Sequence, residues 1–229
     1  MIQNENKILG LILAGGLSKR MGDVNKSLVK INDKTLLELV YKLVKKQLSK
    51  VVINSNLNLK KEINMDHWPD SLEKGLQSSQ RSLCSEQPDI KIIPDKIPGY
   101  LGPLSGIFSG MKWAKKNLSE CKWIASFPVD SIFFPENFIE TMINNINDKT
   151  QVVCAKSNGR IHPVFALWSL KLIDDLEKAL TKEGVRKIDE WTSRYNLEVV
   201  NFRNIEPSID PFFNINTKED LKFANDSFF

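Results

Sequence analysis

The feature that most constrains the fold of this chain is a short apolar segment, residues 8–12, that runs directly into a loop rich in glycine and basic residues. The glycines and cationic side chains of that loop are Gly15, Gly16, Gly22, Arg20 and Lys26. Glycine permits positive φ angles and close backbone approach, so successive N–H groups can face an anion while the basic side chains supply charge. The sequence therefore predicts a β-strand that delivers a phosphate-binding loop.

The spacing of these glycines excludes two common phosphate-binding loops. The region contains neither the G-x-x-x-x-G-K-[ST] pattern of P-loop nucleotide hydrolases nor the G-x-G-x-x-G pattern of dinucleotide-binding dehydrogenases. Both of those enzyme classes are therefore disfavoured.

Composition and cysteine spacing favour an α/β protein in a reducing compartment. The chain has 229 residues, of which 41% are hydrophobic, enough to bury a core without disulfide or metal cross-links. Its three cysteines are isolated from one another, as expected in the cytoplasm. The first residues lack the apolar stretch of a signal peptide, and no apolar run approaches the ~20 residues of a membrane span. We therefore expect a cytoplasmic protein without a membrane anchor.

Positive charge is concentrated in residues 1–61, which hold 12 Lys and Arg residues against 4 Asp and Glu residues. This part of the chain also carries the glycine-rich loop. Three of its lysines, Lys42, Lys45 and Lys46, have the spacing of the solvated face of a helix. We therefore do not expect nucleic acid as a partner.

The order of the next elements predicts parallel strand pairing. Thr35 and Glu38 form a capping-box pattern at the start of an amphipathic helix that extends to residue 47, and an apolar strand follows at residues 50–54. A strand, a helix and a second apolar strand make a βαβ unit, whose strands are parallel. Asn54 ends the second strand, so we expect it to open onto the same crevice as the glycine-rich loop.

Further strands and helices follow along the chain. Strands are expected at 90–93, 123–127, 152–156 and 164–168. Helices are expected at about 103–116, from Pro135 onward and after the capping residue Thr217. The pair Asn158–Gly159 suits a type I′ hairpin turn, and residues 59–88 are expected to form a mobile flap or an insertion with short helices. This order predicts an α/β fold with three layers and a mostly parallel, mixed central sheet.

Two carboxylates, Asp95 and Asp130, each follow a strand and a proline. Mg²⁺ prefers oxygen ligands and usually takes one or two protein carboxylates, with water and substrate phosphates as its other ligands. Asp130 is the better candidate for a metal ligand because it ends a strongly apolar strand. Lys26 and Arg20 are then expected to stabilise negative charge on a phosphoryl group under in-line attack, without a covalent nucleophile.

The loop at residues 13–22 together with Lys26 resembles the signature of nucleotidyltransferases, and further segments resemble the molybdenum cofactor guanylyltransferases in particular. Those segments are Val52–Asn56, Ile93–Asp95, Gly102–Gly106, Pro128–Asp130, His162–Leu167 and Phe213–Thr217. Their order and approximate spacing follow the family over nearly the whole chain.

The resemblance implies a Rossmann-like nucleotidyltransferase fold and the transfer of GMP from Mg-GTP to the terminal phosphate of molybdopterin-bound molybdenum cofactor, with release of pyrophosphate. By motif, the residues implied to contact the nucleotide are Leu13, Ala14, Gly15, Gly16, Lys26, Asn54, Asp95 and Asp130. Asp130 is also implied to bind magnesium, and Asn214 and Asn216 are implied to lie on the pterin side. A single domain, residues 1–229, then has a nucleotide-binding part to about residue 130 and an acceptor-binding part after it. Enzymes that make or receive the cofactor are further candidate partners.

The sequence departs from the family pattern at three positions. Asn25 stands where an acid is common, Val129 where a cysteine is common, and Ile132 where a proline is common. Two alternatives stay open. One is a transferase for another nucleotide or acceptor, such as a cytidylyltransferase for the same cofactor or a sugar-phosphate enzyme. The other is a catalytically silent nucleotide-binding protein.

Several side chains have both a structural and a functional interpretation. His162 lies in a segment that matches the family, but a lone histidine near a hairpin is more often structural. The aromatic residues Phe127, Phe133 and Phe134 are able to stack on a base or a pterin, although core packing is the simpler interpretation. Asn214 and Asn216 are expected on a strand, where alternate residues face one side and either reach the site or cap a loop.

Overall fold

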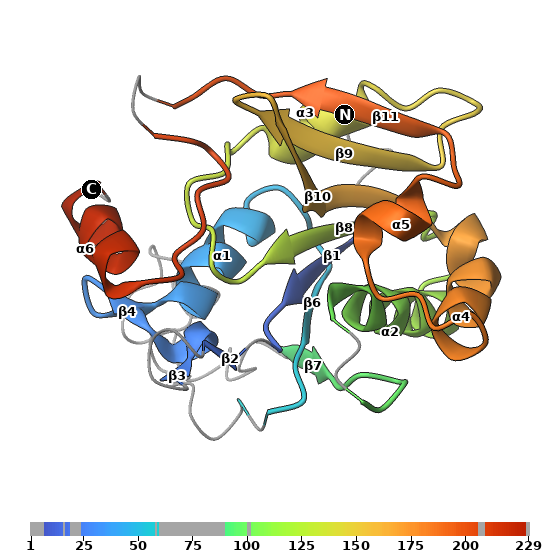
Figure 1. Cartoon of the computed structure of the whole chain (residues 1–229), viewed down its shortest axis with the longest axis horizontal. Coiled ribbons are helices and arrows are strands. Elements are labelled where there is room, and N and C mark those ends of the chain that lie inside the picture. The colour runs from blue at the N-terminus through green and yellow to red at the C-terminus, as the bar shows by residue number, and fades with distance from the viewer. Residues whose placement is uncertain are drawn as a thin grey trace, which may run out of the picture.

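A mostly parallel sheet forms the middle of the molecule (Figure 1). The computed structural model describes residues 7–15, 17–18, 24–57, 59, 90–99, 102–205 and 209–227. Seven strands within these ranges form one sheet in the order β11-β9-β10-β8-β1-β6-β7. Their bounds are β1 Ile8–Leu13, β6 Val51–Asn54, β7 Lys91–Ile93, β8 Trp123–Pro128, β9 Val152–Ser157, β10 Arg160–Ser169 and β11 Leu197–Asn201. Strand β10 runs antiparallel to both of its neighbours and the other pairs are parallel, which confirms the predicted mixed sheet.

The predicted βαβ unit is present. Strand β1 pairs in parallel with β6, with Leu13 opposite Asn54, and helix α1 (Leu36–Lys45) connects the two strands. The Thr35 hydroxyl accepts a hydrogen bond from the Glu38 N–H, and the Glu38 carboxylate accepts one from the Thr35 N–H, so the predicted capping box starts the helix. On its other side β1 pairs with β8, which places β1 well inside the sheet.

Helices cover both faces of the sheet because alternate strand residues point to opposite sides. The helices after α1 are α2 Pro103–Asn117, α3 Phe138–Ile143, α4 Ile173–Thr181, α5 Ile188–Thr192 and α6 Lys218–Ser227. On β1, Ile8 and Ile12 belong to the core beneath α1 and α3, whereas Leu9 and Leu11 belong to the core beneath α2, α4 and α5. The predicted three-layer α/β architecture is therefore confirmed.

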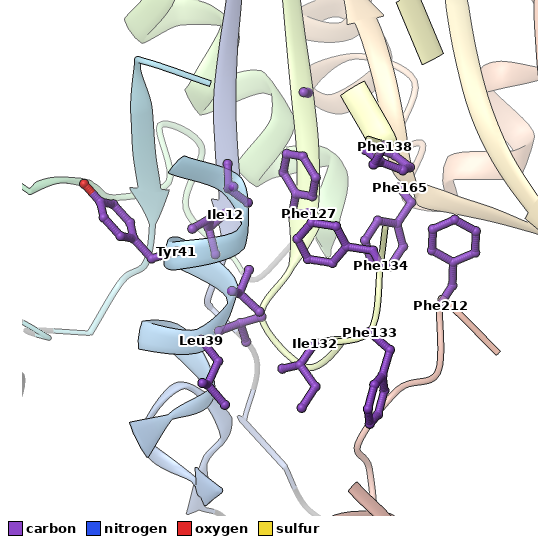
Figure 2. Packing of buried hydrophobic residues seen from close by; sticks show 14 of the residues in the cluster. Ile12, Leu39, Tyr41, Phe127, Ile132, Phe133, Phe134, Phe138, Phe165 and Phe212 are labelled. Atoms are coloured by element: carbon purple, nitrogen blue, oxygen red, sulfur yellow. The ribbon is translucent and has the colours of Figure 1, made fainter. Parts of the chain in front are cut away.

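Phenylalanines fill much of the core on the α1 and α3 side (Figure 2). The ring centroids of Phe127 and Phe134 are 5.1 Å apart, and those of Phe165 and Phe212 are 4.7 Å apart. Phe127, Phe133 and Phe134 are all buried, so core packing explains all three and none is available to stack on a ligand.

Short elements lie between β1 and α1. They are β2 Leu17–Ser18, β3 Val24–Asn25, the 3₁₀ helix η3 Lys26–Leu28, β4 Lys30–Ile31 and β5 Lys34–Thr35. A second 3₁₀ helix, η7 Leu170–Leu172, precedes α4. Helix α6 lies beside β4, so the end of the described chain returns to this region (Figure 1).

Strands β9 and β10 form the predicted hairpin. Asn158 and Gly159 have φ angles of 46° and 79°, as a type I′ turn requires. The ladder is interrupted after His162, because the next paired residue of β10 is Ala166. Pro163 follows His162 and has no N–H for the ladder, so the residues between form a bulge. Strand β10 begins at Arg160, earlier than predicted, and includes this bulge.

The start of one predicted helix and one predicted strand are wrong. Helix α3 begins at Phe138 rather than at Pro135, because the Phe138 N–H bonds to the Pro135 carbonyl across a turn, at 3.0 Å. Residues 213–216 form no strand, because the segment is attached to the loop after β8 instead of a sheet edge. The segment 59–88, apart from Leu59, lies outside the described residues. Among the helices that are described, none is long and apolar enough to cross a membrane.

Candidate active site

A cleft of about 850 Å³ opens at the carboxyl ends of the central strands. Leu13, Asn54 and Pro128 line it, and they are the last residues of β1, β6 and β8. Gly15 lies in the same wall, so the expected crevice between the glycine-rich loop and Asn54 is confirmed. Residues 160–165 of β10 form the opposite wall. This is the edge at which open α/β sheets bind ligands.

Lys26 is positioned by η3. The Asn25 side chain caps η3 by accepting a hydrogen bond from the Ser27 N–H at 3.1 Å. The buried Ser27 hydroxyl donates to the Ala14 carbonyl at 3.2 Å, and the Ala14 N–H donates to the Asn54 carbonyl at 2.9 Å. Lys26 is therefore fixed relative to the ends of both β1 and β6.

The Lys26 ammonium connects the two sides of the cleft. It donates to the Asp130 carboxylate, with Nζ 2.7 Å from Oδ2, and to the side-chain carbonyl of Asn216. The side chains of Lys26 and Asp130 are only 13% and 18% exposed. A backbone bond from the Ile215 N–H to the Asp130 carbonyl, at 2.8 Å, fastens the segment before α6 to the same point.

The other predicted carboxylate, Asp95, is held by Asn54, the last residue of β6, and by Asn56, two residues later. Asn54 Nδ2 donates to Asp95 Oδ1 at 3.0 Å, and Asn56 Nδ2 donates to Oδ2 at 3.0 Å. The Asn56 side-chain carbonyl also accepts the Asp95 N–H at 2.8 Å. All three residues line the cleft, so this end of it presents a fixed polar surface.

Helix α2 approaches this polar surface so closely that a glycine is required. A Cβ at Gly106 would lie 2.4 Å from Asn54 Oδ1 and 2.6 Å from Leu13 Cδ2. Gly102 and Pro103, at the start of the helix, line the cleft, and Gly102 provides no side-chain cap. Pro103 has no N–H, and the Ser105 N–H donates to the Gly102 carbonyl at 3.2 Å, so the first turn of α2 is closed by its own backbone.

His162 of the β10 wall is linked by hydrogen bonds to Ser157, the last residue of β9, and through it to Asp210. The Ser157 hydroxyl lies 2.7 Å and 2.9 Å from the two carboxylate oxygens of Asp210 and 2.8 Å from His162 Nε2. Burial lowers the pKa of His162, the charge of Asp210 opposes that effect, and the charge of Arg160 adds to it. His162 lines the cleft, whereas Ser157 is fully buried behind it.

The pKa of Asp210 is lowered. Burial acts to raise it, but hydrogen bonds from the Phe212 N–H, the Ser157 hydroxyl and the Asn158 amide outweigh burial, and the nearby His162 adds to the lowering. Asp210 is therefore an ionised carboxylate at neutral pH.

The structure brings most of the predicted site residues together. Those in the cleft wall are Leu13, Gly15, Lys26, Asn54, Asp95, Asp130 and Asn214. Ala14 is buried directly behind the wall, and Asn216 reaches the site through its bond to Lys26. Gly16 and Arg20 lie outside the described residues.

Sequence reasoning did not assign a role to Asn56, Gly106 or Ser131. For Asn56 a signal was available in the sequence, because Asn54 and Asn56 are two residues apart at the end of an apolar strand and alternate residues face the same side. Ser131, whose hydroxyl donates to the Asn214 side chain, has its partner 83 residues away, and no local pattern indicates such a contact.

The three departures from the family pattern leave the polar groups of the site in place. Asn25 caps η3 through its side-chain oxygen, a role that an aspartate also performs. Val129 and Ile132 are buried in the core beneath α1 and α3.

The donor set at Asp130 fits a divalent cation shared with substrate phosphates. Asp130 Oδ2 binds Lys26, and Oδ1 accepts no hydrogen bond from any described residue. The described part of the chain has no cluster of three or more His, Cys, Asp or Glu side chains that would hold a metal without substrate. Magnesium requires only one or two protein carboxylates when phosphates complete its shell.

Comparison with known proteins gives the family. Residues 10–195 match the family model described as a MobA-like NTP transferase domain. The chain belongs to this family. A relative from Rhizobium rhizogenes, named molybdenum cofactor guanylyltransferase, is 33% identical over 214 residues, which are 92% of this chain and 87% of the relative. The protein of the same name from Nitrobacter hamburgensis is 32% identical over 216 residues, or 94% of this chain and 91% of that one.

Solved structures share the MobA-like fold. Molybdopterin-guanine dinucleotide biosynthesis protein A from Archaeoglobus fulgidus has a TM-score of 0.66 at 19% identity, covering 95% of this chain and 97% of that one. A 4-diphosphocytidyl-2C-methyl-D-erythritol synthase from Anaerococcus prevotii also has a TM-score of 0.66, at 16% identity, covering 96% and 94%. These likenesses support the nucleotidyltransferase fold.

Proposed function

We propose that this MobA-like enzyme transfers GMP from GTP to the terminal phosphate of the molybdenum cofactor, which forms the guanine dinucleotide cofactor and releases pyrophosphate. The observation that carries the proposal is that Lys26 donates hydrogen bonds to both Asp130 and Asn216, just after the end of β8 and between the two walls of the cleft. The name of the relatives at about 30% identity over most of the chain supports guanine as the base and the molybdenum cofactor as the acceptor.

The reaction is an in-line displacement at the α-phosphorus of GTP. An oxygen of the acceptor's terminal phosphate forms a bond to that phosphorus, and the bond to the bridging oxygen of pyrophosphate breaks, so pyrophosphate leaves with the electron pair. The Lys26 ammonium neutralises charge on the phosphates when it exchanges Asp130 for phosphate oxygens. Such a reaction needs positioned substrates and charge stabilisation rather than a nucleophilic side chain.

The two walls divide the substrates between them in this proposal. The wall at β1, β6 and β7, with Leu13, Ala14, Gly15, Asn54 and Asp95, takes the nucleotide. Gly16 and Arg20, from the same motif, are assigned to the nucleotide as well. The wall at β10 and the segment with Asn214 and Asn216 takes the acceptor. A single domain then contains a nucleotide part up to about residue 130 and an acceptor part after it.

We assign Asp130 as the residue that would hold Mg²⁺ together with the nucleotide. The bound ion would supply neutralisation of the triphosphate charge. A cytoplasmic location is part of the same proposal. It is supported by the two described cysteines, Cys121 and Cys154, which are buried free thiols.

The test is pyrophosphate release by the purified protein with Mg²⁺, the molybdenum cofactor and each of GTP, CTP, ATP and UTP. We expect turnover with GTP, and a loss of about 100-fold or more in kcat for Asp130→Asn with folding retained. Asp174→Asn is the matched control, because the Asp174 side chain is 80% exposed and far from catalysis in this proposal. Absence of release, or full activity of Asp130→Asn, would contradict the proposal. A strict preference for CTP would replace it with the cytidylyltransferase alternative.

A further inference from the structure

We infer that His162 recognises the acceptor, because the chain Asp210–Ser157–His162 orients the imidazole so that its Nδ1 lone pair accepts a hydrogen bond from an N–H group of the acceptor's pterin ring system. The inference rests on the proposed function and concerns the acceptor end of the same cleft. It makes His162 a specificity-determining residue rather than a structural one.

The direction of the hydrogen-bond chain follows from the donors around Asp210. Its carboxylate receives the Phe212 N–H at 2.8 Å, the Asn158 amide at 2.9 Å and the Ser157 hydroxyl at 2.7 Å. All of these groups donate, so Asp210 acts as an acceptor only. The single hydroxyl proton of Ser157 is therefore directed at Asp210.

This direction fixes the tautomer of His162. Because Ser157 Oγ uses its proton on Asp210, it offers only lone pairs to the imidazole 2.8 Å away. His162 Nε2 must then carry a proton and donate it, and in the neutral ring Nδ1 is an acceptor. Among the residues that the structure describes, none forms a hydrogen bond with Nδ1. The same arrangement excludes Ser157 as a nucleophile, because its hydroxyl is fully buried and already engaged.

The ring is held in place as well as in one tautomer. Its centroid is 4.8 Å from that of Phe212, and the two rings are tilted by 43° to one another. The bulge of β10 that begins after His162 is fastened at Val164, whose carbonyl accepts the Ser126 hydroxyl at 2.6 Å. The Trp168 indole N–H donates to the same hydroxyl oxygen at 2.8 Å. A ring held by a hydrogen bond at Nε2 and by contact with Phe212 loses little entropy when a ligand binds to it.

The neutrality of the ring favours an N–H donor over a phosphate as the partner of Nδ1. Burial lowers the pKa of His162, so the ring is neutral at physiological pH and attracts no anion. Pro163, Val164 and Phe165 continue the wall with apolar atoms, which suit a planar ring. A pterin carries amide and amine N–H groups on its edges. Guanine does too, but the proposed nucleotide wall lies on the far side of β8.

Two substitutions of His162 distinguish a role in acceptor recognition from a purely structural role. In His162→Gln the amide can donate to Ser157 from near the Nε2 position, but no acceptor replaces Nδ1. In His162→Asn the side-chain carbonyl lies near the Nδ1 position, but the bond to Ser157 is lost. We expect His162→Gln to raise the KM for the acceptor about 10-fold, as expected for one lost hydrogen bond, with kcat and the KM for GTP within about two-fold. His162→Asn should stay within about three-fold of the wild type.

A purely structural role predicts the opposite order, with His162→Asn impaired and His162→Gln close to wild type. That order, an unchanged acceptor KM for His162→Gln, or a rise in the KM for GTP instead would each overturn the inference. Circular dichroism melting curves establish that both variants are folded before kinetics are compared.

Direct binding separates this inference from the proposed reaction. The probe is the monophosphate of a reduced 6-hydroxymethylpterin, titrated by calorimetry without GTP. In one outcome the wild type binds the probe, His162→Gln binds it about 10-fold more weakly, and the wild type releases no pyrophosphate. The proposed reaction is then wrong, and the role of His162 in binding the acceptor stands. If the wild type releases pyrophosphate but both variants bind the probe equally, the role of His162 is wrong and the reaction stands. If the wild type neither binds the probe nor releases pyrophosphate, both fail.

Discussion

Replacement of Lys26 by alanine should lower both the free energy of unfolding and the kcat/KM for GTP, and the two effects can be measured separately. The Lys26 ammonium is 2.7 Å from the Asp130 carboxylate, and the side chains are 13% and 18% exposed. Opposite charges about 4 Å apart attract by roughly 1 kcal/mol in water and about 4 kcal/mol at an effective dielectric constant of 20. Desolvation cancels part of that attraction. We therefore expect a coupling free energy of about 2 kcal/mol between the two side chains.

The assay is a double-mutant cycle of Lys26→Ala, Asp130→Asn and the double variant, with the free energy of unfolding measured in urea. A loss of about 2 kcal/mol in a domain of this size lowers Tm by about 4–8 °C. The matched control is Lys42→Ala, since Lys42 is exposed on α1 and should change stability by less than about 0.5 kcal/mol. A coupling below about 0.5 kcal/mol would refute the reasoning that the pair is shielded from water.

The same variants also test, by steady-state kinetics, whether the Lys26 ammonium neutralises negative charge on the phosphates of GTP. Loss of one preorganised cationic donor should lower kcat/KM for GTP by about 100- to 1000-fold, whereas Lys42→Ala should leave kcat/KM unchanged. Equal values for Lys26→Ala and the wild type would remove Lys26 from the proposed mechanism.

Three further predictions follow from local packing and ionisation. Gly106→Ala should lower the free energy of unfolding by about 1–3 kcal/mol and raise the KM for GTP, because the new Cβ would lie 2.4 Å from Asn54 Oδ1; urea titration and initial rates test both effects. Ser126→Ala removes a buried hydroxyl that bonds both the β10 bulge and an indole N–H, and should lower stability by about 1–3 kcal/mol, as read from the urea midpoint at constant m-value. The free energy of unfolding should fall as the pH drops below about 6.5, because the folded pKa of His162 is lowered and the unfolded state takes up the proton first; His162→Asn should flatten that dependence in urea titrations between pH 5 and 7. The lowered pKa of Asp210 adds a loss of stability only near and below pH 3.8, as the pH falls through the folded pKa.

The parts of the fold that depend on local patterns were predictable from the sequence. The capping box at Thr35, the βαβ unit and the Asn158–Gly159 turn are determined by residues close together in the chain, and all are present. Asp95 and Asp130 were recognisable as site candidates because each follows an apolar strand, and the carboxyl ends of parallel strands share one edge of a sheet.

The parts that depend on distant partners were not predictable in the same way. An alternating pattern such as that of Asn214 and Asn216 is the same for a paired strand and for an extended segment fastened elsewhere, and only the partner, here the Asp130 carbonyl, decides between them. The bulge of β10 is fastened at Val164 by a hydrogen bond from Ser126, which lies 38 residues earlier. The bond between Lys26 and Asn216 spans 190 residues, and no window of sequence contains both.

That long span has a consequence for the protein while it is being made. Synthesis at about 5–20 residues per second places roughly 4–17 s between the emergence of residue 130 and that of residue 216. During this interval a nascent chain holds Lys26 and Asp130 but lacks Ile215 and Asn216, which fasten the last wall of the cleft to them. A ribosome-bound chain can therefore build its nucleotide side first, but it completes its site only when the segment before α6 has been released from the exit tunnel, and messages that end early yield chains with an open, unfinished cleft.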